Sequence, residues 1–140
     1  MDLTMDIIRD VLICIKNNCE FCTDEKGHFR ASTINWKVIY ENEMLDSKYD
    51  IDDIKYCILK LDEGGLIRTS KAGTNNRVFM LDIDDVTWEG HEFLKNVEDD
   101  SFWNMFKSKM GEGVKFSVSV LAKLSAEAAF EYAKSKLGII

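Results

Sequence analysis

Residues 51–94 decide the fold of this chain, and they read IDDIKYCILKLDEGGLIRTSKAGTNNRVFMLDIDDVTWEGHEFL. The stretch opens with a predicted α-helix, because apolar side chains recur there at spacings of three, four and three. These side chains are Ile51, Ile54, Ile58 and Leu61. The glycine pair at positions 64 and 65 predicts the end of that helix, since glycine tolerates the left-handed conformation common at helix ends.

The middle of the same stretch predicts a β-hairpin. Residues 66–69 and 77–81 are rich in strand-forming side chains and flank a turn-rich segment at 72–76. Thr87 is a suitable N-cap for a helix over residues 88–94. This order is that of the second half of a winged helix. We therefore predict a mainly α fold with a small antiparallel β-hairpin, namely a winged helix (winged helix-turn-helix) followed by C-terminal helices.

Apolar periodicity predicts two helices before this stretch. The first covers residues 4–16 and buries Ile7, Ile8, Val11, Leu12 and Ile15. The second runs through residues 36–40, with Ser32 or Thr33 as its cap. Residues 17–18 and 23–27 predict a polar break, and residues 41–50 predict a charged connection.

Two further helices are predicted at the C-terminal end. An acidic start at residues 99–101 suits the positive end of a short helix that carries Phe102, Trp103, Met105, Phe106 and Met110. A terminal helix is predicted over residues 117–137, although residues 115–120 alternate like a strand. We divide the chain into a winged-helix domain at 1–98 and a C-terminal helical extension at 99–140, packed on that domain or on a partner.

Bulk composition indicates a cytoplasmic protein. The chain has 140 residues, of which 46% are hydrophobic and 31% charged. No apolar run approaches the ~20 residues that span a bilayer, and the N-terminus lacks the pattern of a signal peptide. The four cysteines are accordingly expected to be thiols.

One string in the chain resembles a family signature. Residues 86–94, VTWEGHEFL, closely match the L-T-W-E-G-H-E-F-L string of an uncharacterised bacterial and prophage-encoded family of small winged-helix proteins. Residues 5–9 and 56–61 match the family's opening and third helices in order. The chain departs from the family in having Val86 in place of leucine and Cys57 in place of histidine. The resemblance implies a winged helix with C-terminal helices and a phage or mobile-element setting, and it implies no established activity.

The cysteines are the candidate residues for metal or redox chemistry. Cys14, Cys19 and Cys22, with His28, could surround a tetrahedral ion. However, Cys14 lies near the apolar face of the first helix, and no second compact pair completes the usual zinc spacing. The Cys19–Cys22 pair follows a helix, whereas redox pairs act at a helix N-terminus. We therefore predict no metal and no cofactor.

Enzymatic activity is also not predicted. His91 precedes Glu92, but the H-E-x-x-H metalloprotease pattern would need histidine where the chain has Lys95. We expect His91 to pack against Trp88 or to bond to the backbone. The acids between positions 82 and 100 are typical of a solvated face, and residues 73–76 lack the ending of a phosphate-binding loop.

DNA binding is the first functional hypothesis, because the third helix of a winged helix normally enters the major groove. The hairpin cations Arg68, Lys71 and Arg77, with Asn75 and Asn76, could contact phosphates. Tyr56 and Lys60 could reach bases. Against this, the formal charge is −7, and Asp52 and Glu63 are expected on the outer face of the helix.

A protein-interaction adaptor without nucleic acid is the alternative. Tyr56 and Leu59 lie side by side on the predicted outer face, and tyrosine is enriched in interface cores. The stripe of the terminal helix is a second candidate contact, and it comprises Leu121, Leu124, Ala128 and Tyr132. That stripe is expected to pack on its own domain, with a homodimer as the next alternative.

Overall fold

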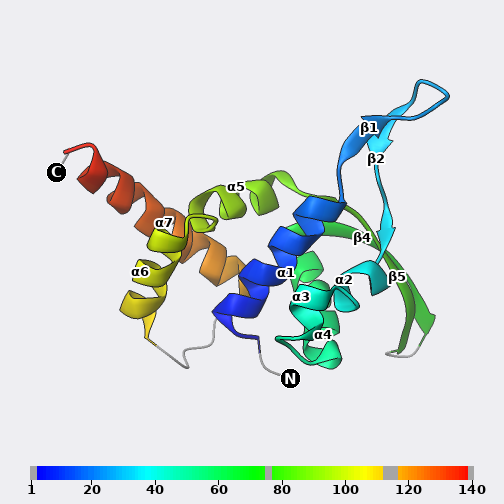
Figure 1. The fold of residues 1–140 in the computed structure, drawn as a ribbon, viewed down its shortest axis with the longest axis horizontal. Coiled ribbons are helices and arrows are strands. Elements are labelled where there is room, and N and C mark those ends of the chain that lie inside the picture. Colours follow the sequence, from blue (N-terminus) through cyan, green and yellow to red (C-terminus); the bar gives the residue numbers. More distant parts are fainter. Residues whose placement is uncertain (1–2, 75–76, 112–116, 139–140) are drawn as a thin grey trace.

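The computed structural model describes residues 3–74, 77–111 and 117–138 (Figure 1). Its helices are α1 (Met5–Asn18), α2 (Lys37–Tyr40), α3 (Glu43–Asp46), α4 (Ile51–Glu63), α5 (Trp88–Val97), α6 (Asp100–Met110) and α7 (Val118–Lys136). Its strands are β1 (Phe21–Thr23), β2 (Phe29–Ala31), β3 (Ile34–Asn35), β4 (Ile67–Thr74) and β5 (Arg77–Val86). The fold is therefore mixed α/β.

An antiparallel sheet with the order β3–β5–β4 lies on one side of the molecule. The predicted hairpin is present as β4 and β5, whose pairing is irregular after Arg68 and after Ala72. β3 extends it, because Ile34 and Asn35 pair with Ile83 and Asp82 of β5. The prediction of only a small hairpin was thus wrong in extent, since a two-residue strand from a distant part of the sequence joins it.

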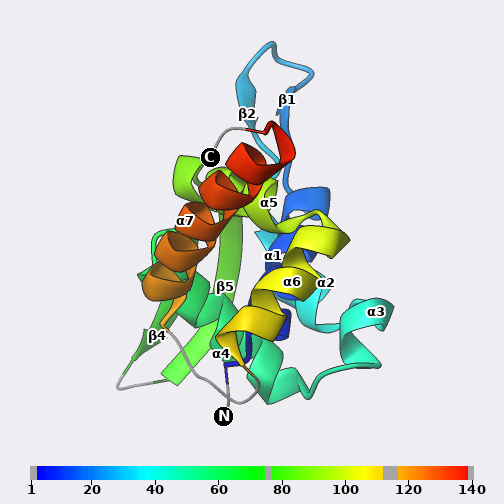
Figure 2. The same ribbon diagram turned by 90° about the vertical axis from the view of Figure 1, so that its left-hand side faces the viewer.

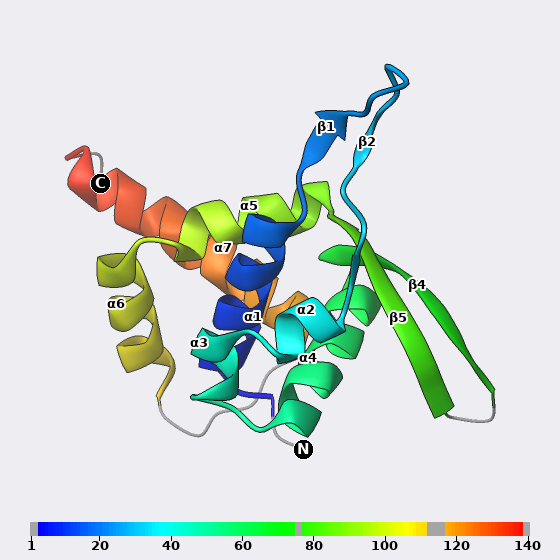
Figure 3. The same cartoon turned by 45° about the vertical axis from the view of Figure 1, so that its right-hand side comes forward.

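A second hairpin, the β1–β2 arm (residues 21–31), projects from the body (Figure 3). The sequence analysis predicted only a polar break here. The turn of the arm is closed by Asp24, whose Oδ1 accepts hydrogen bonds from the backbone N–H groups of Lys26 and His28. The rings of Phe21 and Phe29 stack with centroids 5.4 Å apart. This cross-strand contact stabilises two strands too short to show as a sequence pattern.

Helices α1 and α4 supply the centre of the core. The predicted buried side of α1 is confirmed, and Thr4 caps the helix by accepting from the N–H of Ile7. On α4 the predicted Ile54, Ile58 and Leu61 are buried. Ile51, which the spacing predicted to lie on the same face of the helix, is exposed. The buried Cys57 shifts the centre of the apolar face and leaves Ile51 at its edge.

The connections around α2 and α3 differ from the prediction. Neither Ser32 nor Thr33 caps α2, because both precede β3. Instead the side chain of Asn35 accepts a hydrogen bond from the N–H of Lys37. Residues 41–50, predicted as a connection, contain α3, which begins after Asn42. The Oδ1 atom of Asn42 accepts from the N–H of Met44, and this cap lets a charged segment form one helical turn.

The start of α5 is tied to the start of β4. Thr87, the predicted N-cap, accepts from the N–H of Gly90, and its own hydroxyl donates to the carbonyl of Gly65 at 2.6 Å. The N–H of Thr87 also donates to the carbonyl of Leu66. A Cβ atom added to Gly90 would lie 2.2 Å from that same carbonyl oxygen. This close approach requires glycine and explains the glycine of the TWEGHEFL string.

Helices α6 and α7 pack on the same core (Figure 2). Asp99 caps α6 within the predicted acidic start, and Phe102, Trp103 and Phe106 are buried. Residues 117–120 are not a strand, because Ser117 caps α7 and Val118 begins it. Within the described ranges, no helix is long and apolar enough to cross a membrane.

Candidate functional site

The residues predicted to contact nucleic acid lie on two neighbouring elements. Tyr56 and Lys60 lie on α4, Arg68 and Lys71 lie on β4, and Arg77 begins β5. Helix α4 contacts β4, and Figure 3 shows α4 next to the long β4–β5 hairpin. The fold therefore brings most of the predicted set to one side of the molecule.

Arg68 is held by an acid of its own sheet. Its Nη1 atom donates to Oδ2 of Asp85 at 2.6 Å. The Asp85 side chain is only 9% exposed, whereas that of Arg68 is 63% exposed. The second carboxylate oxygen of Asp85 is buried without a hydrogen-bond partner in the described part of the chain. A buried carboxylate depends on its cation, so Arg68 has a structural role.

The two lysines of the predicted set are also paired within the molecule. Nζ of Lys71 lies 2.9 Å from Oδ2 of Asp62. Nζ of Lys60 lies 2.8 Å from Oε2 of Glu63 and 5.3 Å from the ring centroid of Tyr56. The hydrogen bond from Lys60 to Glu63 raises the pKa of the lysine. Each of these cations therefore has a carboxylate next to it. Sequence spacing alone did not predict the partner of Lys71.

The remaining residues predicted to contact phosphate lie at the tip of the β4–β5 hairpin. Asn75 and Asn76 lie outside the described residues. Arg77 is exposed at the start of β5, where it pairs with Thr74 of β4. The phosphate-contact prediction for the tip of the hairpin therefore stays a prediction.

The outer face of α4 is less exposed at its centre than predicted. Tyr56 and Leu59 are half-buried, and Asp52 and Glu63 are exposed on either side of them along the helix. Leu59 packs against the edge of the hydrophobic core. The face thus offers a small apolar centre between carboxylates.

The alternative contact stripe on α7 faces its own body. Leu121 is fully buried in the core, as expected for a stripe that packs on its own domain, and this corrects its alternative assignment as a partner contact. Leu124 and Tyr132 are half-buried against that core. The ring of Tyr132 meets Phe102 of α6 edge to face, with centroids 5.6 Å apart. The physical reason is the packing of α7 on α5 and α6, which uses this stripe internally.

The cysteines do not form a common site. Cys14 and Cys19 are half-buried, Cys22 is exposed on β1, and Cys57 is buried in α4. Burial raises the pKa of the Cys19 thiol to about 11, with the nearby charges of Asp84 and Asp85 adding to the effect. Burial also raises the pKa of the Cys14 and Cys57 thiols. Over the described ranges, no three His, Cys, Asp or Glu side chains gather as a metal ion requires.

His91 and Trp88 are both exposed side chains of α5. The His91 side chain is exposed on α5 and makes no side-chain hydrogen bond in the described chain, so the predicted bond to the backbone is absent, whereas its packing against Trp88 stays a prediction. Trp88 is exposed too, and the Nζ atom of Lys95 lies 6.0 Å from the centroid of its ring.

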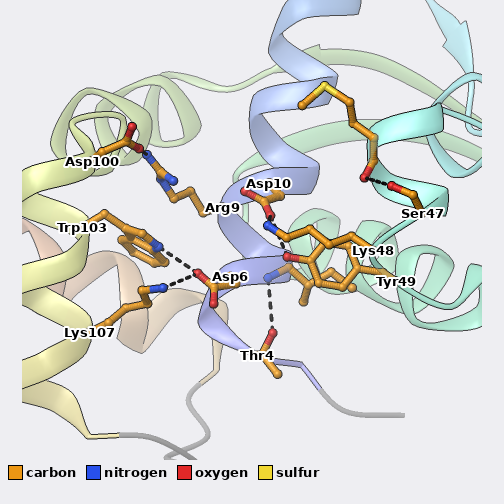
Figure 4. Close-up of polar contacts among 12 residues, drawn as sticks. Thr4, Asp6, Arg9, Asp10, Ser47, Lys48, Tyr49, Asp100, Trp103 and Lys107 are labelled. Carbon is orange, nitrogen blue, oxygen red and sulfur yellow. Dashed lines mark hydrogen bonds and ion pairs between the residues drawn. The ribbon is translucent and has the colours of Figure 1, made fainter.

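A groove along α1 was not predicted. It has a volume of about 600 Å³ and lies between α1, the α3 region and the α5–α6 turn. Figure 4 shows the charged side chains along α1 that tie these elements together. Arg9 donates to the carbonyls of Val97 and Glu98 and to Oδ1 of Asp100. The charges of the groove are therefore committed to holding helices together.

Two further carboxylates of α1 anchor its neighbours in the same way (Figure 4). Asp10 accepts from the hydroxyl of Tyr49 at 2.6 Å and pairs with Lys48. Asp6 accepts from Nε1 of Trp103 and from Nζ of Lys107, each at 2.9 Å. Polar residues at spacings of three and four on α1 were the only sequence signal for this face.

Comparison with known proteins places this mixed α/β chain in one family. The model of the family described as hypothetical protein (DUF2513) matches residues 2–115, so the chain belongs to that family. The matched region includes α6 and ends before α7. No curated protein and no solved structure matches the chain.

Proposed function

We propose that this chain is a non-enzymatic winged-helix protein that binds a protein partner through the outer face of α4. The order α1, β3, α2, α4, β4, β5 supports the winged-helix assignment, as does the position of β5 between β3 and β4. This architecture serves both nucleic-acid and protein contacts. The choice between them therefore rests on the side chains of α4 and the hairpin.

One observation carries the proposal: three of the four cations of the candidate DNA surface pair with the protein's own carboxylates. Arg68 pairs with Asp85, Lys71 with Asp62, and Lys60 with Glu63. Non-specific DNA affinity comes mainly from free cations that displace counterions from phosphates. A helix that also exposes carboxylates at both ends would approach a phosphate row unfavourably.

The same face has the properties of a small protein interface. Tyr56 and Leu59 form an apolar centre, and the acids around it are Asp52, Asp53 and Glu63. Interfaces combine an apolar core with a polar rim whose charges complement the partner. We infer that the partner presents an apolar side chain flanked by lysine or arginine.

A selection from a displayed random peptide library tests this proposal. Wild-type protein should enrich peptides that combine basic and apolar residues, and the Tyr56→Ala/Leu59→Ala double variant should lose them. Trp88→Ala is the matched control, because Trp88 is an exposed aromatic residue on a different element. Enrichment of acidic peptides, or retention of the basic ones by the double variant, would refute the proposal.

A DNA-associated, regulator-like accessory protein is the second candidate function. It is favoured by the exposure of Arg68, Lys71 and Arg77 on the β4–β5 hairpin. Exposed ion pairs contribute little energy, so Lys71 could exchange Asp62 for a phosphate. Duplex affinity that falls with salt, and that Lys71→Ala weakens, would favour this candidate. The phage or mobile-element setting stays a prediction under either function.

The non-enzymatic part of the proposal is supported by the state of the thiols and histidines. The raised pKa values of Cys14, Cys19 and Cys57 keep these thiols protonated near neutral pH, whereas a nucleophilic cysteine acts as thiolate. The two histidines lie on the β1–β2 arm and on α5, and neither is next to a cysteine in sequence.

A further inference from the structure

The terminal helix α7 has an inner and an outer side. Its inner side packs on the body through Val118, Leu121 and Ser125. Its outer side exposes large apolar side chains, of which Phe130 is 64% exposed and Leu137, the C-cap residue, is 74% exposed. Figure 1 shows the C-terminal turns of α7 extending past α5 and α6. An apolar outer side on a projecting helix indicates a contact that the single chain does not provide.

The exposed residues follow the spacing of a two-helix seam. Ala126, Phe130, Ala133 and Leu137 recur at intervals of four, three and four, and all four are exposed. This alternation is that of the a and d positions of a coiled coil. Alanine at every second seam position lets two helices approach closely, and the intervening phenylalanine and leucine can fill the space beside it.

The charges that flank this seam are self-complementary. Glu127 and Lys134 each follow a seam alanine, so they lie on the same flank of the helix. In an antiparallel pair of helices centred on Phe130, Glu127 of one copy is level with Lys134 of the other to within one residue, or about 1.5 Å of rise. The two-fold symmetry then gives two reciprocal ion pairs.

The alternatives for these two charges are less favourable. In a parallel pair the same positions would face Ala122 and Ala129, which carry no charge. Within the single chain, Glu127 has no ion pair among the described residues. Nζ of Lys134 lies 3.8 Å from Oε1 of Glu131, a contact at the limit of an ion pair on an exposed surface. Nζ of Lys134 also lies 5.3 Å from the ring centroid of Phe130, and both contacts are of the weak, exposed kind that Lys134 can exchange for a second partner.

We propose that the outer side of α7 binds a second copy of this chain, as an antiparallel α7–α7 pair with Phe130 at the two-fold axis. This seam differs from the stripe of Leu121 and Tyr132, which packs inside the monomer. It also lies outside the residues that match the family model. The pairing does not involve α4, so it can fail or succeed independently of the proposed function.

Sedimentation equilibrium of the full chain tests the proposal. Protein concentrations of about 10–200 μM are used, because a dimer with a small interface is populated there. Wild-type protein should form a concentration-dependent dimer, and Phe130→Ser should be monomeric throughout. Phe29→Ser is the matched control, because Phe29 is 73% exposed on the β1–β2 arm, and it should dimerise like wild type. A monomeric wild type, or a dimer that survives Phe130→Ser, would overturn the proposal.

A charge-reversal cycle tests the orientation of the pair. Glu127→Lys alone and Lys134→Glu alone should each weaken the dimer about tenfold. Each single variant puts two like charges opposite one another at both of the symmetry-related pairs. The double variant Glu127→Lys/Lys134→Glu should restore wild-type association. Circular dichroism on all three variants checks that the monomer remains folded. A double variant as weak as the single ones would overturn the antiparallel arrangement.

Discussion

The Nη1 atom of Arg68 lies 2.6 Å from Oδ2 of Asp85, across the paired strands β4 and β5. The carboxylate is almost fully buried and the guanidinium is largely exposed. The pair therefore supports the sheet, and it commits a cation that the position of the hairpin would otherwise offer to a phosphate. Asp85 also precedes Val86 and Thr87, which lead into α5.

Arg68→Ala should lower the free energy of unfolding by about 1–3 kcal/mol, because it leaves the Asp85 carboxylate buried and unpaired. The double variant Arg68→Ala/Asp85→Asn should recover part of this loss, since an amide carries no charge. Urea denaturation measures both. Lys95→Ala, which removes an exposed partner of Glu92, is the control and should change stability by less than about 0.5 kcal/mol. Equal stabilities for Arg68→Ala and wild type would contradict the structural role.

Gly90→Ala should destabilise the fold by about 2–4 kcal/mol. The added methyl group would meet the carbonyl oxygen of Leu66 at 2.2 Å and the side chain of Val86 at 2.6 Å, so α5 would have to move away from β4. Thermal or urea unfolding measures the change. Glu89→Ala, an exposed position in the same helical turn, should be nearly neutral. A well-tolerated alanine at position 90 would show that α5 does not approach β4 this closely.

Acid sensitivity should depend on Asp6. Burial raises its pKa, but hydrogen bonds from Lys107 and Trp103 and the charge of Lys107 outweigh that effect, so the net pKa in the folded state is lowered. The unfolded chain then binds the proton more readily. The contribution of Asp6 to stability is present above the unfolded pKa of ~3.9 and is lost as pH falls through the lower folded value.

Asp6→Asn should therefore flatten the fall in stability between about pH 5 and about pH 3, and it should lower stability at pH 7. The loss in the free energy of unfolding at pH 7 is expected to be below about 1 kcal/mol, because the Asp6 side chain is nearly half exposed. Urea midpoints across this pH range provide the measurement. Asp52→Asn, on the exposed start of α4, is the control. Parallel pH curves for Asp6→Asn and wild type would argue against the role of this carboxylate.

Local signals in the sequence predicted the elements that carry their own caps and periodicity. Thr87 was the predicted cap of α5, and residues 4 and 99 were the predicted starts of α1 and α6. In the structure each of these three side chains accepts a hydrogen bond from its helix. The β1–β2 arm and β3 could not be predicted in this way. Their strands have three residues or fewer, and β3 exists only because a distant strand, β5, pairs with it.

The candidate site was only partly predictable for a related reason. The positions of Tyr56 and Leu59 follow from helical periodicity alone, and the structure leaves both half-buried on α4. The partners of the cations depend on tertiary geometry. The irregularity after Arg68 sets the register that places it opposite Asp85, and the angle between α4 and β4 brings Lys71 to Asp62. Neither can be derived from sequence spacing.

Duplex binding by fluorescence anisotropy, at about 50 mM salt, tests most directly the claim that the protein's own acids neutralise this surface. Wild-type protein should show no binding to a ~30-base-pair duplex at up to ~10 μM, a concentration that lies within the usual range of non-specific dissociation constants. Asp62→Asn/Glu63→Gln, which frees Lys71 and Lys60, should gain binding that falls with added salt. Salt-dependent binding by wild type, weakened by Lys71→Ala, would contradict the account.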